Sequence, residues 1–508
     1  MPAFPNLTDA IFDHAEKHPK LVALEDVTGR LTYKQFANLI GRASVWLRSL
    51  GIEAGQPIGV RLTNSADHLI LSLALMRIGA AKVEFGIGSD GKQFDATVRA
   101  LNVTTLFIEP PAKAIGNVRC ITIDAGWRRM LAGFKGDCRH DAETPEPSDI
   151  LLSSGSTGPA KGVPCTHRMT LGRLADWYPA WHKAGMVSED YSGSFLLASS
   201  MSFSGFLTGL LSRLVTGGKI VILPEFAKLL DFVRAIQSHE DAILIVTPGM
   251  CQELLSCAPD EGLLFPDMRC IICTGTPLPA QAKRDAIRSL TPNFTEMYGN
   301  AGAGLVAALY PEDIPGHADS VGRVLSTVAV EVVDGDGRPV GPNVAGHLRC
   351  KGGGVADDLI GNSGSGGGLE GVRDGWYYSG DLAAIDDEGY LHLKGRAADA
   401  VVRRGVQVFP AIVEMALMSH PDVREAVVLG IGQGADAQVV AVVRAAMPPP
   451  EPKAMLRYCI DQVGNAQTPN HFMLVKEMPR TAAGKIDRAK VKALVVKELE
   501  GVRRRADT

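Results

Sequence analysis

The chain of 508 residues is long enough for several domains, and its 46% hydrophobic and 21% charged residues are ordinary for a globular enzyme. Lysine and arginine (52) are nearly balanced by aspartate and glutamate (56), so the formal net charge is only −4. This balance excludes the strongly basic surface that is typical of proteins that bind nucleic acids or anionic membranes.

The sequence contains no apolar run long enough to span a membrane. The best candidate, which starts at Leu69, is interrupted by Arg77 and Lys82. The N-terminal residues lack the basic start, apolar stretch and cleavage site of a secretory signal. Nine cysteines without framework spacing fit a reducing compartment, so we expect a cytoplasmic protein.

Helical and strand-like stretches alternate along the first 290 residues. Residues 7–15 have apolar side chains four apart, as in an amphipathic helix. Strands are expected at 58–62, 105–110, 218–223, 242–247 and 269–275, and a helix at 279–290. This alternation favours an α/β fold with a largely parallel sheet covered on both faces. Cys270 and Cys273 form a CxxC pair within one such strand, and we expect core packing there rather than a zinc site.

Residues 151–163, LLSSGSTGPAKGV, join an apolar lead-in to a run of serine, glycine and threonine that ends near Lys161. Glycines let backbone N–H groups converge on an anion, while hydroxyls and a lysine add donors and charge, so we expect a phosphate-binding loop. The common P-loop pattern needs Gly-Lys five residues after its first glycine, but the fifth residue after Gly155 is Ala160. A flexible Ser/Gly linker remains the alternative from this stretch alone.

The composition changes near residues 396–400. Before this point lies the glycine-rich stretch 361–371, which we expect to be a surface loop. After it, 423–432 and 437–446 are typical of two paired strands, and the tail from 490 is helical and then charged. The sequence thus predicts a large N-terminal part and a small C-terminal part.

Four further stretches accompany the Ser/Gly loop: TGTPLP (274–279), TEMYGNAGAG (295–304), the segment 377–414 that begins YYSGDL, and PRTAAGKIDR (479–488). In order and spacing they resemble the superfamily of adenylate-forming enzymes, which contains acyl-CoA synthetases, adenylation domains of peptide synthetases and luciferases. The resemblance extends over nearly the whole chain. It implies a large N-terminal AMP- and acyl-binding domain of layered β-sheets and helices, residues 1–396, and a smaller, mobile α+β C-terminal domain, residues 397–508.

The resemblance also implies an ATP site. Tyr298 matches the aromatic residue that stacks on adenine, Asp381 the carboxylate that binds both ribose hydroxyls, and Arg396 a second ribose and phosphate contact. A packed core tyrosine and a turn-capping aspartate are the structural alternatives. The implied ATP- and AMP-binding set is Ser153, Ser154, Gly155, Ser156, Thr157, Gly158, Lys161, Gly275, Thr276, Pro277, Tyr298, Gly299, Asn300, Asp381, Leu393 and Arg396.

Lys485 is the catalytic residue that the resemblance implies. It reaches from the small domain and bridges the substrate carboxylate and the α-phosphate, and the alternative is a solvated lysine in a basic tail. The implied reaction converts a carboxylic acid and ATP to acyl-AMP and pyrophosphate, after which a thiol displaces AMP. The small domain rotates between the two steps, and Gly405 matches a glycine beside the pantetheine arm. The implied cofactors are ATP, Mg²⁺ and CoA.

The sequence departs from the superfamily pattern at several positions. Ala301 and Gly302 replace a threonine that contacts the α-phosphate and a glutamate that binds Mg²⁺, so the metal ligand is unknown. Mg²⁺ commonly takes one or two carboxylates plus substrate phosphates, so we expect weaker positioning unless a neighbouring group supplies the ligand. The hinge position, usually aspartate or lysine, is Ala398, and Ala160 replaces a usual proline.

Residues 202–219 align with the region that lines the acyl pocket. Ser204 stands where amino-acid-activating domains carry an aspartate, which disfavours a free α-amino acid. Met201, Phe203 and Phe206 suggest an apolar fatty or aryl acid, although they could equally be core residues, and Gly302 could open space for an unusual substrate. We therefore predict an acyl-CoA ligase. The alternatives are a stand-alone adenylating enzyme that loads a carrier protein and a nucleotide- or acyl-binding homologue that has lost catalysis.

Overall fold

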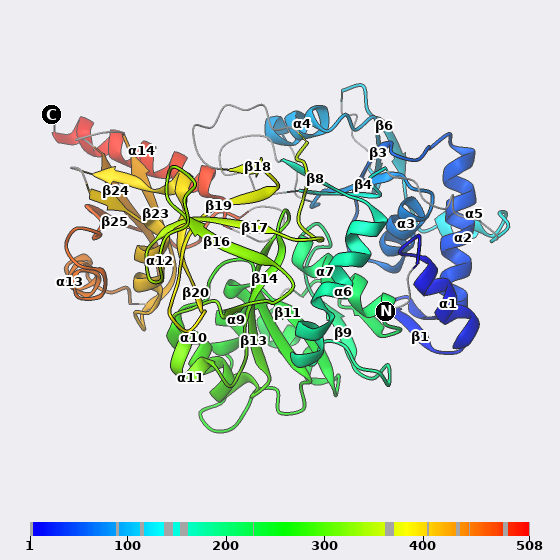
Figure 1. Cartoon of the computed structure of the whole chain (residues 1–508), viewed down its shortest axis with the longest axis horizontal. Helices are drawn as coiled ribbons and strands as arrows, with labels where there is room; N and C mark the ends of the chain where they lie inside the picture. The colour runs from blue at the N-terminus through cyan, green and yellow to red at the C-terminus, as the bar shows by residue number, and fades with distance from the viewer. Residues whose placement is uncertain are drawn as a thin grey trace.

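The chain is described by a computed structural model, which covers residues 4–87, 91–111, 116–136, 146–152, 161–226, 228–360, 370–403, 406–432, 437–446, 448–480 and 486–506. Three sheets form the large N-terminal part, and a small unit carries the C-terminus at the opposite end of the molecule from helix α1 (Asp9–Lys17) (Figure 1). This mixed α/β architecture confirms the expected fold class.

The N-terminal residues contribute a six-stranded sheet with the order β6-β5-β3-β4-β7-β8. Its strands are β3 (Pro57–Arg61), β4 (Ala81–Glu84), β5 (Thr105–Ile108), β6 (Arg119–Thr122), β7 (Asp149–Leu152) and β8 (Gly162–Cys165). All neighbours are parallel except β7 and β8, which are antiparallel. The expected phosphate loop, residues 153–158, lies outside the described residues, but the two strands that flank it pair directly with each other.

A nine-stranded sheet follows, with the order β15-β14-β13-β12-β11-β9-β10-β1-β2. Its strands are β1 (Val22–Asp26), β2 (Gly29–Thr32), β9 (Ser194–Leu197), β10 (Lys219–Ile222), β11 (Ala242–Val246), β12 (Cys270–Thr274), β13 (Phe294–Asn300), β14 (Gly304–Leu309) and β15 (Arg323–Val324). The central strands are parallel and continuously apolar, because helices cover both of their faces. Cys270 and Cys273 are fully buried on β12, as expected.

Helices connect the strands and begin at residues that can cap them. Thr32 and Gln35 form a capping box at the start of one helix, and Ser65, Thr166 and Thr247 cap three others. The helices of this part are α2 (Tyr33–Ser49), α3 (Ala66–Arg77), α4 (Gly91–Ala100), α5 (Trp127–Leu131), α6 (His167–Lys183), α7 (Ser204–Val215), α8 (Leu229–Gln237), α9 (Pro248–Leu255), α10 (Ala280–Asp285) and α11 (Ile314–His317). The helix expected at 279–290 divides into α10 and a π-helix, Ala286–Leu290.

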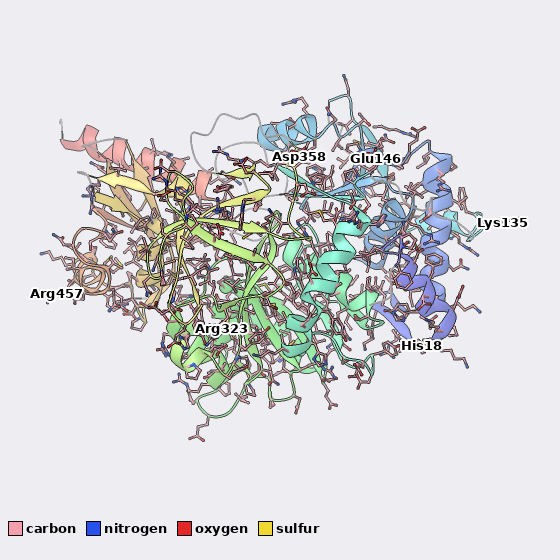
Figure 2. The ribbon with its side chains drawn as sticks, viewed as in Figure 1. His18, Lys135, Glu146, Arg323, Asp358 and Arg457 are labelled. Atoms are coloured by element: carbon pink, nitrogen blue, oxygen red, sulfur yellow. The ribbon has the colours of Figure 1, made fainter. Side chains whose placement is uncertain are left out.

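The charged side chains lie mainly at the periphery. Lys135, Arg323 and Arg457, from three distant parts of the chain, are exposed, and Figure 2 shows Lys135 and Arg457 at opposite edges of the molecule. Among the described residues, no helix is both long enough and apolar enough to cross a membrane.

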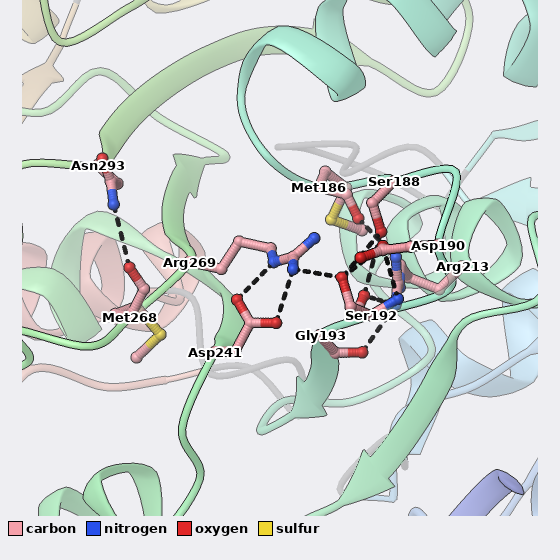
Figure 3. Close-up of polar contacts among 10 residues, drawn as sticks. All are labelled: Met186, Ser188, Asp190, Ser192, Gly193, Arg213, Asp241, Met268, Arg269 and Asn293. Atoms are coloured by element: carbon pink, nitrogen blue, oxygen red, sulfur yellow. Dashed lines mark hydrogen bonds and ion pairs between the residues drawn. The ribbon is translucent and has the colours of Figure 1, made fainter.

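Two arginines organise the amino ends of the parallel strands (Figure 3). Arg269 binds the Asp241 carboxylate with Nε and Nη2, at 2.7 and 2.6 Å. Arg213 is fully buried. It donates to the backbone carbonyls of Met186, Ser192 and Gly193 at 2.8–3.2 Å. A Cβ at Gly218 would overlap this guanidinium, so glycine is required there. These contacts close the amino end of the sheet.

A five-stranded antiparallel sheet brings distant parts of the chain beside the nine-stranded sheet. Its strands are β16 (Ala329–Val333), β17 (Gly346–Lys351), β18 (Gly371–Arg373), β19 (Trp376–Ile385) and β20 (Leu391–Arg396). Asp381 on β19 lies directly opposite Arg396 on β20. The sheet therefore places these two predicted site residues next to each other.

The residues after Arg396 form a unit with its own apolar core, which includes Val408, Val439 and Met455. Its elements are a 3-10 helix (Ala397–Asp399), β21 (Val401–Arg403), β22 (Val406–Val408), α12 (Pro410–Met418), β23 (Val423–Ile431), β24 (Gln438–Ala445), α13 (Pro452–Val463), β25 (His471–Leu474) and α14 (Arg488–Ala506). Strands β23 and β24 are antiparallel partners, as the sequence predicted.

Candidate active site

The predicted nucleotide residues meet at the carboxyl ends of the parallel strands. Asp381 is buried, and its Oδ1 lies 2.8 Å from Nε of Arg396. Arg396 also donates to the Ser379 carbonyl at 2.9 Å, so its guanidinium is held in place from two sides. The Arg396 side chain keeps 41% of its surface exposed, which leaves donors available to a ligand.

Tyr298 on β13 completes this group. Its hydroxyl donates to Oδ2 of Asp381 at 2.5 Å. Burial and then the Asp381 carboxylate raise the pKa of Tyr298 well above its ordinary value, so the hydroxyl stays a donor. A carboxylate has about four acceptor positions, so Asp381 can hold Tyr298 and Arg396 and still accept from a ribose. The bond also holds the hydroxyl end of the ring that we expect to stack on adenine.

The strip Gly275, Thr276 and Pro277 follows β12 next to Tyr298 on the neighbouring strand. Gly275 and Thr276 are exposed, and the φ angle of +120° at Gly275 suits glycine. Behind the strip, the N–H of Leu278 donates to Oε1 of Glu296 at 2.7 Å, and Lys283 lies 2.5 Å from Oε2. This buried ion pair holds the strip in position from below.

Lys161 is the described member of the predicted phosphate loop. Its Nζ lies 3.1 Å from Oε1 of Glu370. Glu370 is close to Gly380, between Ser379 and Asp381, and a Cβ at Gly380 would lie 3.3 Å from both the Glu370 carboxyl carbon and the Arg396 Nη1. The ion pair of the loop lysine therefore lies near the Asp381–Arg396 pair, on the two sides of Gly380.

The turn after β13 is held by a buried arginine that the sequence did not single out. Arg173 on α6 donates from Nη2 to the carbonyls of Ala301 and Gly302, at 3.0 Å each, and from Nε to the Gly354 carbonyl at 2.5 Å. Asn300 Oδ1 accepts from the N–H groups of Gly302 and Ala303, at 3.1 and 2.8 Å. The backbone is therefore fixed at the two positions that depart from the superfamily pattern.

Gly302 faces Tyr377 on β19. A Cβ at Gly302 would overlap the ring and the hydroxyl of Tyr377, so no side chain fits beside this tyrosine. The place where the superfamily pattern puts a glutamate is filled by a phenol instead. Gly302 is absent from the lining of the cavity that Met201 and Ser204 line, and its assignment to the acyl pocket stays a prediction.

The predicted acyl-pocket residues lie around the start of α7. Met201 and Phe206 are almost completely buried, and the rings of Phe203 and Phe206 are 5.1 Å apart. Next to Met201 is a cavity of about 10 Å³, enough for about one water molecule. It is lined by Glu84, Asp149, Ile150, Leu151, Leu152, Met201, Ser202, Ser204 and Leu207. The floor of this region is therefore partly polar, which the apolar pattern at 201–206 did not indicate.

The polar floor belongs to a buried charge cluster on the six-stranded sheet. Lys82 lies 3.2 Å from Glu84 and 3.1 Å from Asp149, and His68 lies 2.9 Å from Glu84. Burial raises the pKa of Asp149. Burial alone would also raise the pKa of Glu84, but Lys82 and His68 lower it on balance. In sequence, Lys82 only looked like an interruption of an apolar run.

The chain matches two sequence models of known families. The model described as AMP-binding enzyme matches residues 11–358, and that of the AMP-binding enzyme C-terminal domain matches residues 412–485. The chain belongs to the AMP-binding enzyme family.

The similar proteins of this family include several CoA ligases. The chain is 26% identical to the 2-succinylbenzoate–CoA ligase of Geobacillus kaustophilus, over 94% of this chain and 96% of that protein. It is 24% identical to the indoleacetate–CoA ligase of Aromatoleum aromaticum, over 97% and 98%. The ATP-bound crystal structure of MatB from Rhodopseudomonas palustris superposes with a TM-score of 0.83 at 21% identity, covering 97% of this chain and 99% of MatB.

In this AMP-binding enzyme, Lys485 is the last residue that the C-terminal model matches, and it lies outside the described residues, as does Gly405. Arg480 and Ile486, which flank residues 481–485, pair with each other. A Cβ at Gly249, at the start of α9, would lie 3.9 Å from Nη1 of Arg480. The segment that carries Lys485 therefore begins next to the carboxyl edge of the large sheet.

The remaining predicted site residues that the structure describes are Leu393, Gly299, Asn300 and Ala398. Leu393 lies on β20, half-buried, and Gly299 and Asn300 end β13. Ala398 is exposed in the 3-10 helix between β20 and β21, where the chain passes from the large part to the small one. Its role as a hinge stays a prediction.

Proposed function

We propose that this AMP-binding enzyme activates a carboxylic acid with ATP and transfers the acyl group to the thiol of CoA. The observation that carries the proposal is the group of Tyr298, Asp381 and Arg396, which three strands from two sheets bring together. The names of the similar proteins, several of them CoA ligases, support the same reaction.

The chemistry has two balanced steps. A carboxylate oxygen of the acid attacks the α-phosphorus of ATP, the bond to pyrophosphate breaks, and acyl-AMP forms. The sulfur of CoA then attacks the acyl carbon, AMP leaves, and the thiol proton is released. Asp381 and Arg396 orient the ribose, Tyr298 stacks on adenine, and Lys485 bridges the charge on the α-phosphate and the carboxylate.

Mg²⁺ enters this scheme as part of the Mg·ATP substrate. Gly302 supplies no carboxylate and Tyr377 fills the space beside it, so a metal-binding glutamate does not fit there. The described residues contain no group of three histidine, cysteine or acidic side chains suited to a metal. Phosphate oxygens and water are the usual main ligands of Mg²⁺ in such substrates, and Gly302 fits that mode because it requires no carboxylate at this position.

The proposed substrate class is an aryl or other apolar acid. Phe203 and Phe206 offer aromatic surface at the start of α7. The similar ligases are named for 2-succinylbenzoate and indoleacetate, both aryl acids with a polar substituent or ring nitrogen. The carboxyl groups of Glu84 and Asp149 in the floor fit an acid that carries a hydrogen-bond donor, such as a ring N–H, away from its carboxylate.

The domain organisation and the location are also proposals. We place the boundary after Arg396, so that residues 1–396 bind the nucleotide and the acid and residues 397–508 rotate about Ala398 to bring Gly405 to the CoA path. We place the enzyme in the cytoplasm, because the eight cysteines that the structure describes are all free thiols.

The test is pyrophosphate release with Mg·ATP across a panel of fatty, aryl and short-chain acids, with and without CoA. We expect release that depends on an aryl acid, rises with CoA and falls by about 10²–10³ or more in Lys485→Ala, because a charged donor to the transition state is removed. Release that ignores CoA would instead favour a carrier-protein acceptor. ATP binding without release from any acid would favour a homologue that has lost catalysis.

A further inference from the structure

The ring of Tyr377 belongs to the apolar core beside β17 and β14, but neither that core nor the superfamily pattern accounts for its hydroxyl. Its ring packs on Gly302, and its side chain is only 7% exposed. Its neighbour in sequence, Tyr378, is equally buried, but that hydroxyl accepts a hydrogen bond from Arg349 at 3.0 Å. Among the described residues, Tyr377 makes no hydrogen bond with its hydroxyl, although the oxygen keeps accessible surface.

The charged groups near Tyr377 are those of the nucleotide site. Arg396, Asp381 and Glu370 all act on its hydroxyl electrostatically, and Cys350 is opposite Tyr377 on the neighbouring strand β17. Glu370 binds Lys161 of the phosphate loop, and Asp381 binds Arg396. Tyr377, four residues before Asp381 on β19 and packed on Gly302 at the end of β13, therefore belongs to the same region as these two ion pairs.

The chemistry of the phenol suits an anionic ligand. Burial raises the pKa of Tyr377 to about 12, so the hydroxyl keeps its proton throughout the neutral range. A hydroxyl that keeps accessible surface and has no partner among the described residues can donate to a bound ligand without breaking a hydrogen bond within the protein. Each oxyanion of the substrates offers an acceptor, and a hydrogen bond to a charged acceptor is stronger than one to a neutral group.

The surroundings hold Tyr377 rigidly in this position. Arg173 and Asn300 fix the backbone at Gly302, and the absence of a Cβ there lets the ring approach. Gly354 in turn has no side chain where Arg173 passes. Gly302, Gly354 and the buried Arg173 thus together hold the Tyr377 ring in one position.

We propose that Tyr377 donates its hydroxyl proton in a hydrogen bond to a phosphate oxygen of the bound nucleotide, at the place where a metal-binding side chain is absent. This inference rests on the proposed function, because it needs ATP in the site. Tyr377 is then a catalytic residue for adenylation, and its contribution is a direct donor in place of a carboxylate that acts through Mg²⁺.

The experiment compares Tyr377→Phe with Tyr378→Phe. Both variants remove one buried phenol oxygen from adjacent positions and keep the ring. ATP binding is measured by calorimetry without acid, and pyrophosphate release is measured with saturating acid. In Tyr377→Phe we expect ATP to bind about 5-fold to 10-fold more weakly and kcat/KM for ATP to fall about 10²-fold, with the melting temperature and the KM for the acid unchanged. Tyr378→Phe should leave ATP binding and kcat/KM unchanged.

Three results would overturn the inference. Unchanged ATP binding and kcat/KM in Tyr377→Phe would mean that the hydroxyl touches no substrate. A higher KM for the acid alone would assign the hydroxyl to the acid carboxylate rather than to a phosphate. Equal losses in both variants would indicate only a packing role. If the wild type binds ATP but releases no pyrophosphate, the proposed ligase activity fails, while weaker ATP binding by Tyr377→Phe would still support the contact.

A second variant adds a carboxylate where the phenol is removed. In Tyr377→Leu with Gly302→Glu, the shorter leucine leaves room for the glutamate that the superfamily pattern places at 302. We expect this double variant to need less Mg²⁺ for half-maximal pyrophosphate release than Tyr377→Leu alone, because a carboxylate ligand has been added. An unchanged Mg²⁺ requirement would contradict the claim that phenol and carboxylate share one place.

Discussion

The two ends of the nine-stranded sheet use buried charge in different ways. At the amino ends of the strands, Arg213 binds three backbone carbonyls and Arg269 binds Asp241, so both guanidinium groups donate to acceptors within the protein (Figure 3). At the carboxyl ends, the Tyr377 hydroxyl has no partner among the described residues and Arg396 is 41% exposed. Polar groups at the first end support the fold, and those at the second are left for a ligand.

Two arginines make the contrast sharper, because they are built alike. Arg213 and Arg173 are both buried, both bind backbone carbonyls, and each passes a glycine that leaves room for it, Gly218 or Gly354. Arg213 only ties loops together. Arg173 holds the turn that contacts Tyr377. A buried arginine bound to backbone carbonyls therefore positions a site residue at the carboxyl end of the sheet and stabilises the fold at the amino end.

The largest effect on stability is expected from Arg213→Met, which removes the guanidinium hydrogen bonds at the amino ends of the strands. Methionine keeps most of the volume but removes the donor from the buried Met186 carbonyl and from the partly buried carbonyls of Ser192 and Gly193, and a buried carbonyl left unsatisfied costs about 1–3 kcal/mol. We expect the free energy of unfolding, measured by urea denaturation, to fall by about 3 kcal/mol or more. The pyrophosphate release of the folded enzyme should not change.

Arg213→Lys is the matched control, since it keeps the charge but cannot reach all three carbonyls. The free energy of unfolding of Arg213→Lys should lie between those of the wild type and Arg213→Met. A loss below about 1 kcal/mol in Arg213→Met would mean that the amino-end contacts are not a main support of the sheet.

A smaller effect is expected at the carboxyl end from Gly302→Ala. The new Cβ overlaps the Tyr377 ring, and overpacking of this kind typically costs about 1–3 kcal/mol. Unlike Arg213→Met, the substitution should also lower ATP affinity, because the ring and its hydroxyl must move. Urea denaturation and ATP titration measure the two effects on one preparation.

Tyr377→Leu provides the test of mechanism for Gly302→Ala. The loss of unfolding free energy in Gly302→Ala is expected to come from overlap of the new Cβ with the Tyr377 ring. If so, Gly302→Ala should be less destabilising in the Tyr377→Leu background than in the wild type, by about 1 kcal/mol or more. Strictly additive losses would show that Gly302 is required for some other reason.

Much of the fold could be predicted from local sequence. The strands expected at 218–223, 242–247 and 269–275 match β10, β11 and β12 to within one residue at each end, because continuous apolar runs are typical of buried parallel strands. The expected layered sheets are confirmed, but the sequence did not indicate how the strands divide between a nine-stranded and a six-stranded sheet. Which helix-linked strands pair is decided by packing between distant segments, which no local pattern encodes.

The candidate site divides in the same way. Asp381 and Arg396 could be found because their residue types and spacing form a pattern, and the structure places them in contact. Tyr377 lies only four residues before Asp381, so the doubled tyrosine in YYSGDL was a visible signal, but its meaning depends on Gly302, far away in sequence. Lys82 and Arg173 could not be recognised, since the partners that satisfy a buried charge are known only once the chain is folded.

The smallest effect is expected from Asp190→Asn, in the amino-end network. Oδ1 of Asp190 accepts from the Ser192 N–H at 3.1 Å and from its hydroxyl at 2.5 Å. These bonds, with a further one from Ser188, lower the pKa of Asp190 from 3.8 to about 2. Because the folded pKa lies below the unfolded one, the ionised carboxylate stabilises the fold above about pH 4, and this contribution is lost as the pH falls toward 2.

The urea midpoint of Asp190→Asn should therefore lie slightly below that of the wild type at pH 7, and the gap should close as the pH falls below 4. Glu189→Gln is the control, since Glu189 is exposed and makes no hydrogen bond within the described residues, and it should show no gap at pH 7. A gap that stays constant down to pH 3 would mean that the asparagine disturbs the turn sterically. A difference in urea midpoint that disappears below pH 4 would show that the ionised Asp190 carboxylate, although exposed, stabilises the folded state. Arg396, which is exposed at the carboxyl end of the sheet, is instead available to a ligand.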